Sequence, residues 1–189
     1  MQIKKLEFYY FIEKLKDFRK HKKILLNLIS QMPNSNVNNN IESISKTDWN
    51  VPTEYNREYA KYFLNIITDY MSKLTDFLYV KEWQISNIWF QQYENKDKHN
   101  WHTHGHAHFT NVFYLELPDN NYKTEIFDIS GNILDIDVKE GDILTFPAFY
   151  NHRSKTNYSN KRKTIISFNS NFVDSNRNKI SKALTNNIK

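Results

Sequence analysis

The sequence predicts an α+β domain in which helices come first and a β-barrel or jelly roll follows. Apolar residues recur at helical spacing in the first part of the chain, and short β-branched and aromatic runs separated by turn residues follow from about residue 81. Such runs are typical of barrels and jelly rolls, and the preceding helices are expected to pack outside one sheet. We expect a single domain over residues 1–189, with helical support in 1–80, the β core in 81–172 and a polar tail in 173–189.

Two helices are expected in the front part. Apolar residues between positions 11 and 32 recur at roughly helical spacing, and the polar stretch 33–40 then predicts an exposed loop. A better pattern runs from about 54 to 77, where Thr53, directly after Pro52, is expected to cap the N-terminus. Its continuous apolar stripe, which we expect to be core, consists of Tyr59, Tyr62, Phe63, Ile66, Ile67, Tyr70, Met71 and Leu74.

The strands of the second part are marked by their composition and by the turns between them. Turn chemistry occurs at residues 118–121, 130–132 and 139–142. The residues that indicate strands are Ile85, Trp89, Phe109, Val112, Tyr114, Ile126, Ile143, Leu144, Phe146, Ile165, Ile166 and Phe168. Several short strands in this order predict a sheet-rich core that carries any functional site.

The composition restricts the classes of protein and of site. A chain of 189 residues with 39% hydrophobic and 15% aromatic residues can bury a real core. Cysteine is absent, so disulfides and thiolate metal sites are excluded. Any transition metal must therefore be held by His, Asp or Glu, which suits iron, zinc or manganese.

Neither a membrane span nor a targeting segment is indicated. No stretch approaches the roughly 18 apolar residues that a span needs, and the start lacks the apolar run of a signal peptide, so we expect a cytoplasmic protein. The net charge of +5 permits an anionic partner such as nucleic acid. Because the Lys and Arg residues are scattered, the charge indicates solubility rather than a nucleic-acid site.

Histidines gather in one short segment. Five of the seven lie in residues 99–108, with the sequence HNWHTHGHAH. His102 and His104 alternate and would share one face of an extended strand, where two imidazoles can hold a metal. His152, which follows the buried-looking strand ILTF, is the candidate for the third ligand. The alternative is a solvated, His-rich surface tract, and His106 and His108 could also compete as ligands.

An arginine, Arg162, follows His152 in the sequence. Arg162 lies ten residues after His152, and on adjacent antiparallel strands this spacing can bring its guanidinium near the metal ligand. A guanidinium there would hold a carboxylate through two hydrogen bonds. The combination of HxH, a distal His and this Arg indicates a metal site with an anchor for an acidic cosubstrate.

These segments resemble a known superfamily. The runs WHTHGHAHFTNVFYLELP, GDILTFPAFYNH and KRKTIISFNSNF are similar to those of iron(II)- and 2-oxoglutarate-dependent oxygenases, and most of all to small oxygenases of marine bacteria and phages. The resemblance covers about residues 89–172. It implies a double-stranded β-helix, the cupin-like form of the jelly roll, with Fe(II) as the metal, 2-oxoglutarate as cosubstrate and O2 as oxidant.

The resemblance also implies roles for individual residues. His102 and His152 would be metal ligands, and Arg162 would pair with the far carboxylate of 2-oxoglutarate, with Thr164 as a hydroxyl helper. Tyr93 and Tyr114 stand where related prolyl hydroxylases place tyrosines that contact the cosubstrate. Such an enzyme would hydroxylate its substrate while converting 2-oxoglutarate into succinate, but no pattern in the sequence names the substrate.

The sequence departs from the superfamily at one ligand position. The usual motif is HxD or HxE, and here His104 takes the place of the carboxylate. Either three imidazoles bind the iron or His104 turns away. The acidic residues that come later, Glu116, Glu125 and Asp128, are expected at turns or sheet edges.

Two other functions compete with the oxygenase. A cupin-type metal protein that does not use 2-oxoglutarate would share the fold, but the glutamate expected after HxH is replaced by His108, and Arg162 would have no role. A non-enzymatic module could bind nucleic acid or protein through a basic, aromatic surface. Segments such as YNREYAKYF contain both residue types, but at amphipathic spacing that buries the aromatic side.

Overall fold

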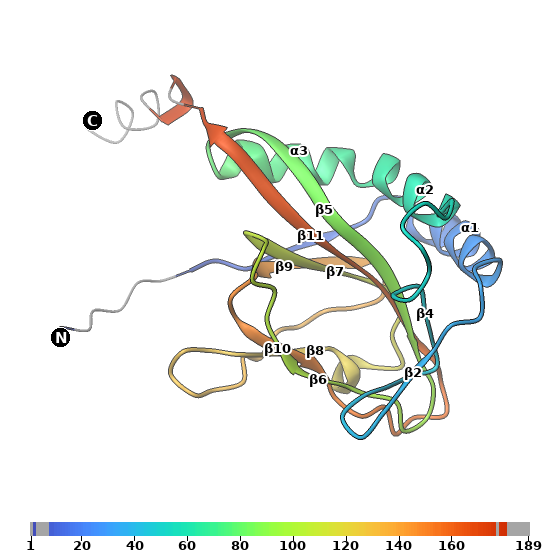
Figure 1. The fold of residues 1–189 in the computed structure, drawn as a ribbon. Coiled ribbons are helices and arrows are strands. Elements are labelled where there is room, and N and C mark those ends of the chain that lie inside the picture. Colours follow the sequence, from blue (N-terminus) through green and yellow to red (C-terminus); the bar gives the residue numbers. More distant parts are fainter. Residues whose placement is uncertain (1, 3–7, 177, 181–189) are drawn as a thin grey trace.

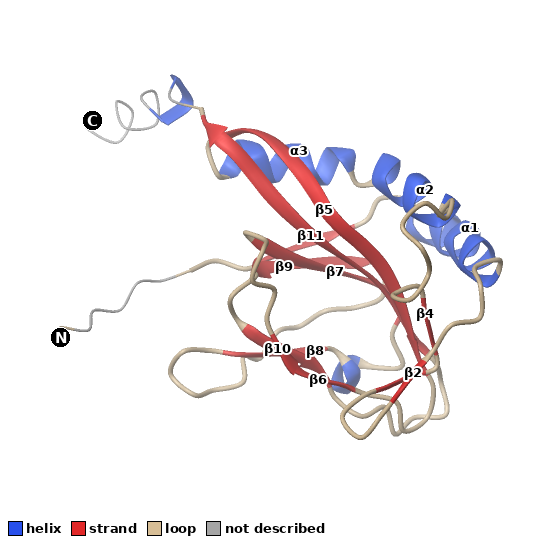
Figure 2. Cartoon of the chain, in the orientation of Figure 1, coloured by secondary structure: helices blue, strands red, loops and turns tan. Residues whose placement is uncertain are grey.

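The computed structural model describes residues 2, 8–176 and 178–180, which form three layers (Figure 1). A six-stranded sheet lies in the middle, a three-stranded sheet faces one side of it, and helices cover the other side (Figure 2). All strand pairs in the two sheets are antiparallel. This arrangement confirms the predicted packing of the front helices outside one sheet.

The order of the strands differs from their order in the chain. The six-stranded sheet runs β1-β9-β7-β11-β5-β4, and the smaller sheet runs β6-β10-β8. The larger sheet contains β1 (Phe11–Lys14), β4 (Lys46–Thr47), β5 (Val80–Tyr93), β7 (Phe109–Glu116), β9 (Asp142–Pro147) and β11 (Lys163–Ser175). The smaller sheet contains β6 (His99–His102), β8 (Thr124–Phe127) and β10 (Asn151–Ser154), and β2 (Val37–Asn38) forms a hairpin with β3 (Ser43–Ile44). The helices are α1 (Phe18–Ser30), α2 (Glu58–Ile66), α3 (Thr68–Phe77) and the short 3₁₀ turn η1 (Asn120–Tyr122).

The core divides into two clusters, one on each face of the larger sheet. Ile166 and Phe168 of β11 pack with Phe63 under the helices, whereas Ile165 packs with Ile126 between the two sheets. The division follows from the strand geometry, because successive side chains point to opposite faces. The stripe predicted for residues 59–74 is confirmed as core, with its buried members at positions 59, 63, 67, 70, 71 and 74.

A buried polar chain fastens the helix layer to the sheet. The hydroxyl of Tyr70 on α3 donates to Oγ1 of Thr145 on β9 over 2.6 Å, and Thr145 donates in turn to the side-chain oxygen of Asn111 on β7. Asn111 then donates to the carbonyl of Phe168 over 3.0 Å. Since every member has a partner, the chain fixes α3 relative to three strands without leaving a buried polar group unsatisfied.

The first predicted helix is shorter than its pattern. Residues 11–14 form β1 and pair with β9, and the helix begins only at Phe18, after Asp17 with a left-handed φ of 52°. The aromatic and β-branched pair Phe11–Ile12 fits a sheet edge, and pairing with a distant strand overrides the local helical spacing.

The second predicted helix is two helices, and Thr53 does not cap either. The chain turns at residues 52–56, Arg57 occupies the N-cap position of α2, and the helical run is interrupted at Ile67 before α3. The guanidinium of Arg57 donates to the Asp48 carboxylate over 2.8 Å and to the Val51 carbonyl over 2.8 Å. These bonds hold the turn in place, so the helix begins later than the Thr–Pro signal predicts.

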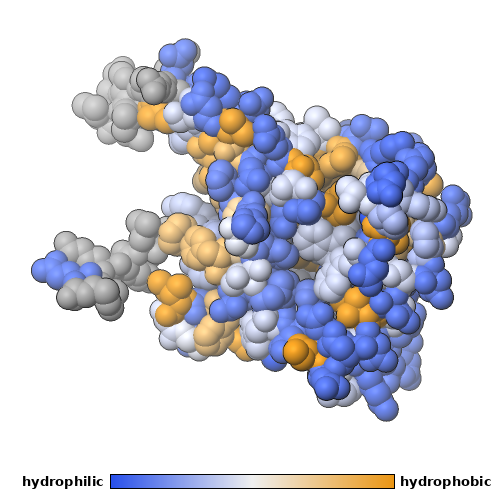
Figure 3. Space-filling model, viewed as in Figure 1, coloured by the Kyte–Doolittle hydropathy of each residue, from blue (hydrophilic) through white to orange (hydrophobic). Residues whose placement is uncertain are grey.

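At its C-terminal end, the β core is longer than predicted. β11 continues to Ser175, beyond the predicted end of the core at 172, and most of the predicted polar tail lies outside the described residues. Among the helices described, none is long and apolar enough to cross a membrane. The face seen in Figure 3 is mostly hydrophilic and carries several separate hydrophobic patches.

Gly141 is required where α1 meets β9, and its replacement by Ala should destabilise the fold. Its φ is +89°, and an added Cβ would lie 2.6 Å from the Phe18 ring. We expect Gly141→Ala to lower the free energy of unfolding by about 2 kcal/mol or more, measured by urea denaturation. Gly105→Ala is the matched control, because nothing lies within 4 Å of its added Cβ. Equal stabilities of the two variants would contradict this account of the turn.

Candidate metal centre

The fold brings three of the predicted histidines together. His102 ends β6 and pairs directly with His152 on β10, across the smaller sheet. The backbone N–H of His104 donates to the carbonyl of Ala148 over 3.0 Å, which holds the loop after β6 against the turn that leads into β10. Two segments far apart in the sequence are thereby fixed side by side.

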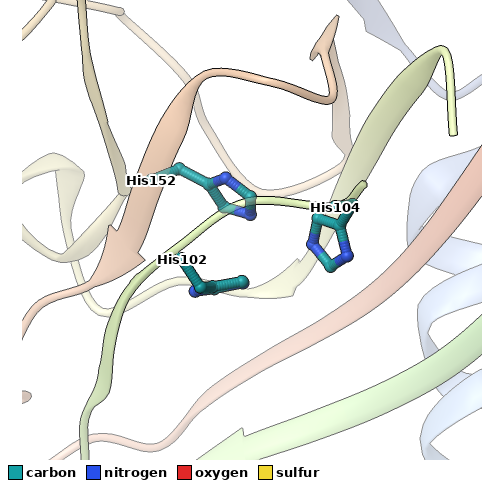
Figure 4. Close-up of side chains that lie close together, drawn as sticks. All are labelled: His102, His104 and His152. Carbon is teal, nitrogen blue, oxygen red and sulfur yellow. The ribbon is translucent and has the colours of Figure 1, made fainter. Parts of the chain in front are cut away.

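The three imidazoles form a cluster of metal-binding geometry. One ring nitrogen of each of His102, His104 and His152 lies within 4.8 Å of the others, and the rings point toward a common space (Figure 4). The centroid of His102 is 4.2 Å from that of His152, and His104 lies 5.1 Å from both. His106 and His108 are exposed and do not belong to the cluster. The structure thus brings His104, rather than a later histidine, to the other two.

Two of the rings are oriented by backbone carbonyls. Nδ1 of His102 lies 2.7 Å from the Asn100 carbonyl, and Nδ1 of His152 lies 3.0 Å from the Tyr150 carbonyl. A carbonyl only accepts, so each Nδ1 carries the proton and leaves the Nε2 lone pair available. This second contact is the usual way in which proteins orient metal-ligating histidines.

His104 is held differently. Its Nδ1 lies 3.3 Å from the side-chain amide of Asn169, and its Nε2 is buried without a hydrogen-bond partner among the described residues. The atom of Asn169 that faces Nδ1 is the amide nitrogen; turning this amide over by 180° presents its oxygen, so that Nδ1 carries the proton and the Nε2 lone pair is left for a cation. A buried ring nitrogen without a partner beside two free Nε2 atoms fits a bound metal ion.

All three imidazoles are neutral at physiological pH. Burial and, next in effect, the nearby His102 lower the pKa of His104 to about 4. Burial likewise lowers the pKa of His152 well below its ordinary value. For His102, burial again lowers the pKa, and the Asn100 carbonyl and the charge of Glu42 partly oppose the shift. Neutral imidazole is the form that binds metals.

The histidines line a partly open cavity between the two sheets, with about 310 Å³ of empty space when the part open to solvent is included. None of the described residues that line it is acidic. The larger sheet contributes Trp89, Gln91, Tyr93, Thr110, Val112, Ile165 and Ser167, and the smaller sheet and its loops contribute His99, His102, His104, Thr124, His152, Arg153 and Ser154. Besides His104 Nε2, the Tyr93 hydroxyl and the Trp89 indole nitrogen are buried without partners in the described part of the chain.

A buried lysine lies beside this lining and was not predicted from the sequence. Lys163 is 1% exposed, its ammonium donates to Ser154 Oγ over 2.8 Å, and it lies 5.3 Å from the centre of the Tyr93 ring. It forms no ion pair with a described carboxylate. Burial lowers its pKa to about 7. The cavity therefore has a neutral histidine cluster in its lining, and a group that can carry a positive charge lies directly behind Ser154 and Tyr93.

The predicted cation, Arg162, lies elsewhere. Its guanidinium donates to both oxygens of Glu116, over 2.8 and 3.1 Å, and Thr164 donates to the same carboxylate. Arg162 and Thr164 point to the opposite face of the sheet from Lys163 because side chains alternate along the strand. Neither lines the histidine cavity, so the structure does not bring them beside the metal ligands as expected.

The two predicted tyrosines are also separated. Tyr93 lines the cavity, whereas Tyr114 is buried in the core between the sheets and its hydroxyl accepts from the backbone N–H of Thr124 over 3.1 Å. Tyr114 is thus already satisfied within the protein. Counting alternate positions back from Ser167, which lines the cavity, would have identified Lys163 as the inward cation.

One more histidine supports the cluster. His99 stacks on His102 with ring centroids 3.9 Å apart, and its Nε2 lies 3.2 Å from the carboxylate of Glu42. Its Nδ1 lies 3.2 Å from the amide nitrogen of Gln91. Burial lowers the pKa of His99 to about 3, with the neighbouring His102 next in effect, so this ring too is neutral.

Comparison with known proteins identifies the fold. No protein-family model and no curated protein matches the sequence. A 2OG-Fe(II) oxygenase-family oxidoreductase from Burkholderia pseudomallei is similar in structure, with a TM-score of 0.63 and 12% identity over 81% of this chain and 79% of that one. A Pseudomonas putida prolyl-4-hydroxylase gives 0.60 and 11% over 87% and 92%. A Trichoplax adhaerens prolyl hydroxylase, solved with a hypoxia-inducible-factor peptide, gives 0.62 and 15% over 90% and 86%. The chain shares the fold of these oxygenases.

The buried state of Lys163 should be visible in the stability of the metal-free protein. In the unfolded chain its pKa is near 10.5, and in the folded chain it is about 7. Between these values the unfolded state binds more protons, so the contribution of Lys163 to stability rises with pH. From pH 7 to pH 9 we expect a gain of about 2 kcal/mol. Thermal and urea unfolding at both pH values would measure it.

The matched variant is Lys163→Met, which keeps the length of the side chain without the charge. It should be more stable than the unaltered protein at pH 7 and should lack this rise. An equal rise in the variant would show that Lys163 is not buried as described.

Proposed function

We propose that this protein is an iron(II)- and 2-oxoglutarate-dependent oxygenase that hydroxylates its substrate. The observation that carries the proposal is that three neutral histidines with free ring nitrogens line one cavity. A buried lysine without a carboxylate partner among the described residues contacts Ser154 and lies over Tyr93, two residues of the same lining. A metal ion fits the histidines, and a dicarboxylate fits a cavity that has a cation but no acidic lining residue.

The strand order supports the finer description of the fold. The adjacent strands β5-β11-β7-β9 and β6-β10-β8 form two facing antiparallel sheets. From β5 to β11, successive strands of the chain fall alternately in the larger and the smaller sheet. We take this arrangement to be a double-stranded β-helix, the form of jelly roll proposed from the sequence, with the site between its sheets.

Each residue of the site has a proposed role. His102, His104 and His152 would hold Fe(II) through their Nε2 atoms, and Lys163 would take the anchoring role first assigned to Arg162. The Tyr93 hydroxyl is buried, has no partner among the described residues and lies near Lys163, so it can donate to the same carboxylate. Trp89, whose ring centre is 5.6 Å from that of His104, presents an N–H to any acceptor near the metal.

The protein's own contribution is binding, orientation and exclusion of water. Bound Fe(II) and 2-oxoglutarate supply the oxidising chemistry, in which O2 is consumed, 2-oxoglutarate becomes succinate and CO2, and a substrate C–H bond is hydroxylated. Lys163 and Ser167 lie on the same face of β11, and four residues of strand separate them by roughly 13 Å. A dicarboxylate bound at the lysine would therefore extend along this face toward the histidines that lie near Trp89.

Metal and cosubstrate binding can be tested without knowledge of the substrate. We expect the protein, loaded with Fe(II) without oxygen, to develop the visible charge-transfer band of a chelated 2-oxo acid when 2-oxoglutarate is added. His152→Ala should lose the band because it loses a ligand. Lys163→Met should weaken 2-oxoglutarate binding by at least about 10-fold, since a charged hydrogen bond is lost.

The adjacent basic residue provides the control for this titration. Arg162→Met should bind 2-oxoglutarate like the unaltered protein, because its side chain lies on the other face of β11. A loss confined to Arg162→Met would restore the anchor predicted from the sequence. Metal binding without any band would instead favour the cupin-type protein that does not use 2-oxoglutarate.

The charge of Lys163 should also set the pH dependence of 2-oxoglutarate binding. Its pKa in the free protein is about 7, and a bound carboxylate stabilises the protonated form. Affinity should therefore fall as the pH rises above about 7, by up to about 10-fold per unit. Lys163→Arg should bind with a flat profile, since Arg stays charged. Titration of the Mn(II)-loaded proteins from pH 6.5 to pH 9 measures both; parallel profiles would contradict the role of Lys163.

A further inference from the structure

The proposed ligand set leaves a charge unbalanced. Three neutral imidazoles add no negative charge to a divalent cation, and protonated Lys163 adds a third positive charge to the site. A 2-oxoglutarate dianion would offset two of these three charges. The lining residues described include no carboxylate that could offset the last one. Burying net charge is costly, so a compensating anion just outside the cavity would strengthen metal binding.

Glu42 is placed to be that anion. It lies at the tip of the β2–β3 hairpin, where its backbone N–H donates to the side chain of Asn39 over 2.9 Å. The next residue, Ser43, exchanges backbone hydrogen bonds of 3.0 and 2.8 Å with Lys98, directly before β6. The hairpin is thereby attached to the strand that carries His102, and the side chain of Glu42 is only 24% exposed.

His99 connects this carboxylate to the metal centre. The amide nitrogen of Gln91 donates to Nδ1 of His99, which leaves the ring proton on Nε2, and this nitrogen lies 3.2 Å from the Glu42 carboxylate. The His99 ring also stacks on the ring of His102, with 3.9 Å between the ring centroids and 24° between the ring planes. A negative charge thus lies one aromatic ring away from a proposed ligand.

Other carboxylates near the site are already paired with cations or backbone donors. Glu125 pairs with Arg153 at 2.7 Å and with Lys155 at 3.6 Å, and Glu116 pairs with Arg162 at 2.8 Å. Among the residues described, the ion-pair contact of Glu42 is with His99, whose Nδ1 faces the amide nitrogen of Gln91 and therefore carries no proton. Its charge is therefore not cancelled by a neighbouring described side chain.

We propose that Glu42, acting through His99, supplies the negative charge that the all-histidine ligand set lacks, and so strengthens the binding of a divalent cation. The inference rests on the proposed metal centre. Glu42 is a positioning residue: it touches neither metal nor substrate, holds the His99 ring against His102, and stabilises positive charge at the cluster. Loss of this charge should weaken a trivalent ion more than a divalent one, because the electrostatic energy scales with the charge of the ion.

Glu42→Gln isolates the charge. The Gln side-chain oxygen can still face His99 Nε2–H, so the polar contact remains and only the negative charge is lost. We expect the dissociation constant for Co(II), measured by calorimetry without 2-oxoglutarate, to rise by about 10-fold. Glu42→Asp should bind more tightly than Glu42→Gln. The matched control is Glu58→Gln on exposed α2, which should bind Co(II) like the unaltered chain.

A second pair of measurements separates charge from structure. The Fe(III)/Fe(II) midpoint potential should move to a more positive value in Glu42→Gln, which a purely structural contact would not cause. His99→Phe keeps an aromatic ring but breaks the connection, and the double variant with Glu42→Gln should bind Co(II) no more weakly than His99→Phe alone. Unchanged Co(II) affinity and potential in Glu42→Gln would overturn the inference.

The failure of this inference is distinguishable from failure of the proposed function. If the unaltered chain binds no Co(II) beyond the level of His152→Ala, the metal centre itself is wrong. If it binds Co(II) at the histidines and Glu42→Gln binds equally well, only the role of Glu42 is wrong.

Discussion

The alternation of side chains along β11 is the constraint on which both the core and the site depend. β11 is hydrogen-bonded to β5 on one side and to β7 on the other, so its register is fixed over most of its length. Even-numbered residues such as Ile166 and Phe168 pack under the helices, and odd-numbered residues such as Ile165 and Ser167 face the smaller sheet. A shift by one residue would exchange the apolar and polar faces and destroy both clusters. The position of Lys163 in the site is a consequence of the same packing that stabilises the fold.

The polar interior lies between the two sheets, beside the hydrophobic cluster that packs there. Burying an ammonium with a hydroxyl as partner disfavours the charged form, as the lowered pKa of Lys163 shows. Rings that are also neutral because they are buried add no charge of their own. The interior therefore favours an anion beside the lysine and a cation beside the histidines. These are opposite preferences within one cavity, and they are the physical basis of the proposed function.

The sequence was sufficient to predict the grouping of His102, His104 and His152 and the order of layers, but not the buried cation beside the cavity. HxH and a histidine after a buried strand are local patterns. They can be recognised even when the predicted strand boundaries are wrong by a few residues. The choice between Arg162 and Lys163 depends on which residue begins β11, and boundaries are the least certain part of such a prediction. The contact between Glu42 and His99 is beyond sequence reasoning of this kind, because a short polar hairpin gives no periodic signal. β1 was missed for a related reason: four residues carry too few alternations to show a period, and their pairing partner is far along the chain.

The unpartnered polar atoms of the cavity restrict what can occupy it. Leaving a buried donor or acceptor unsatisfied costs about 1–3 kcal/mol, so an apolar occupant would make the imbalance at Trp89, Tyr93 and His104 permanent. His104 Nε2 can meet a cation, whereas the phenol and the indole N–H can meet only an acceptor. A metal ion together with an oxygen-rich anion satisfies all three groups at once, and each of the two makes the other's site more favourable. We therefore expect each ligand to raise the affinity of the protein for the other. The anion offsets the charge of the metal ion, and together the two satisfy buried polar groups that either one alone would leave without a partner.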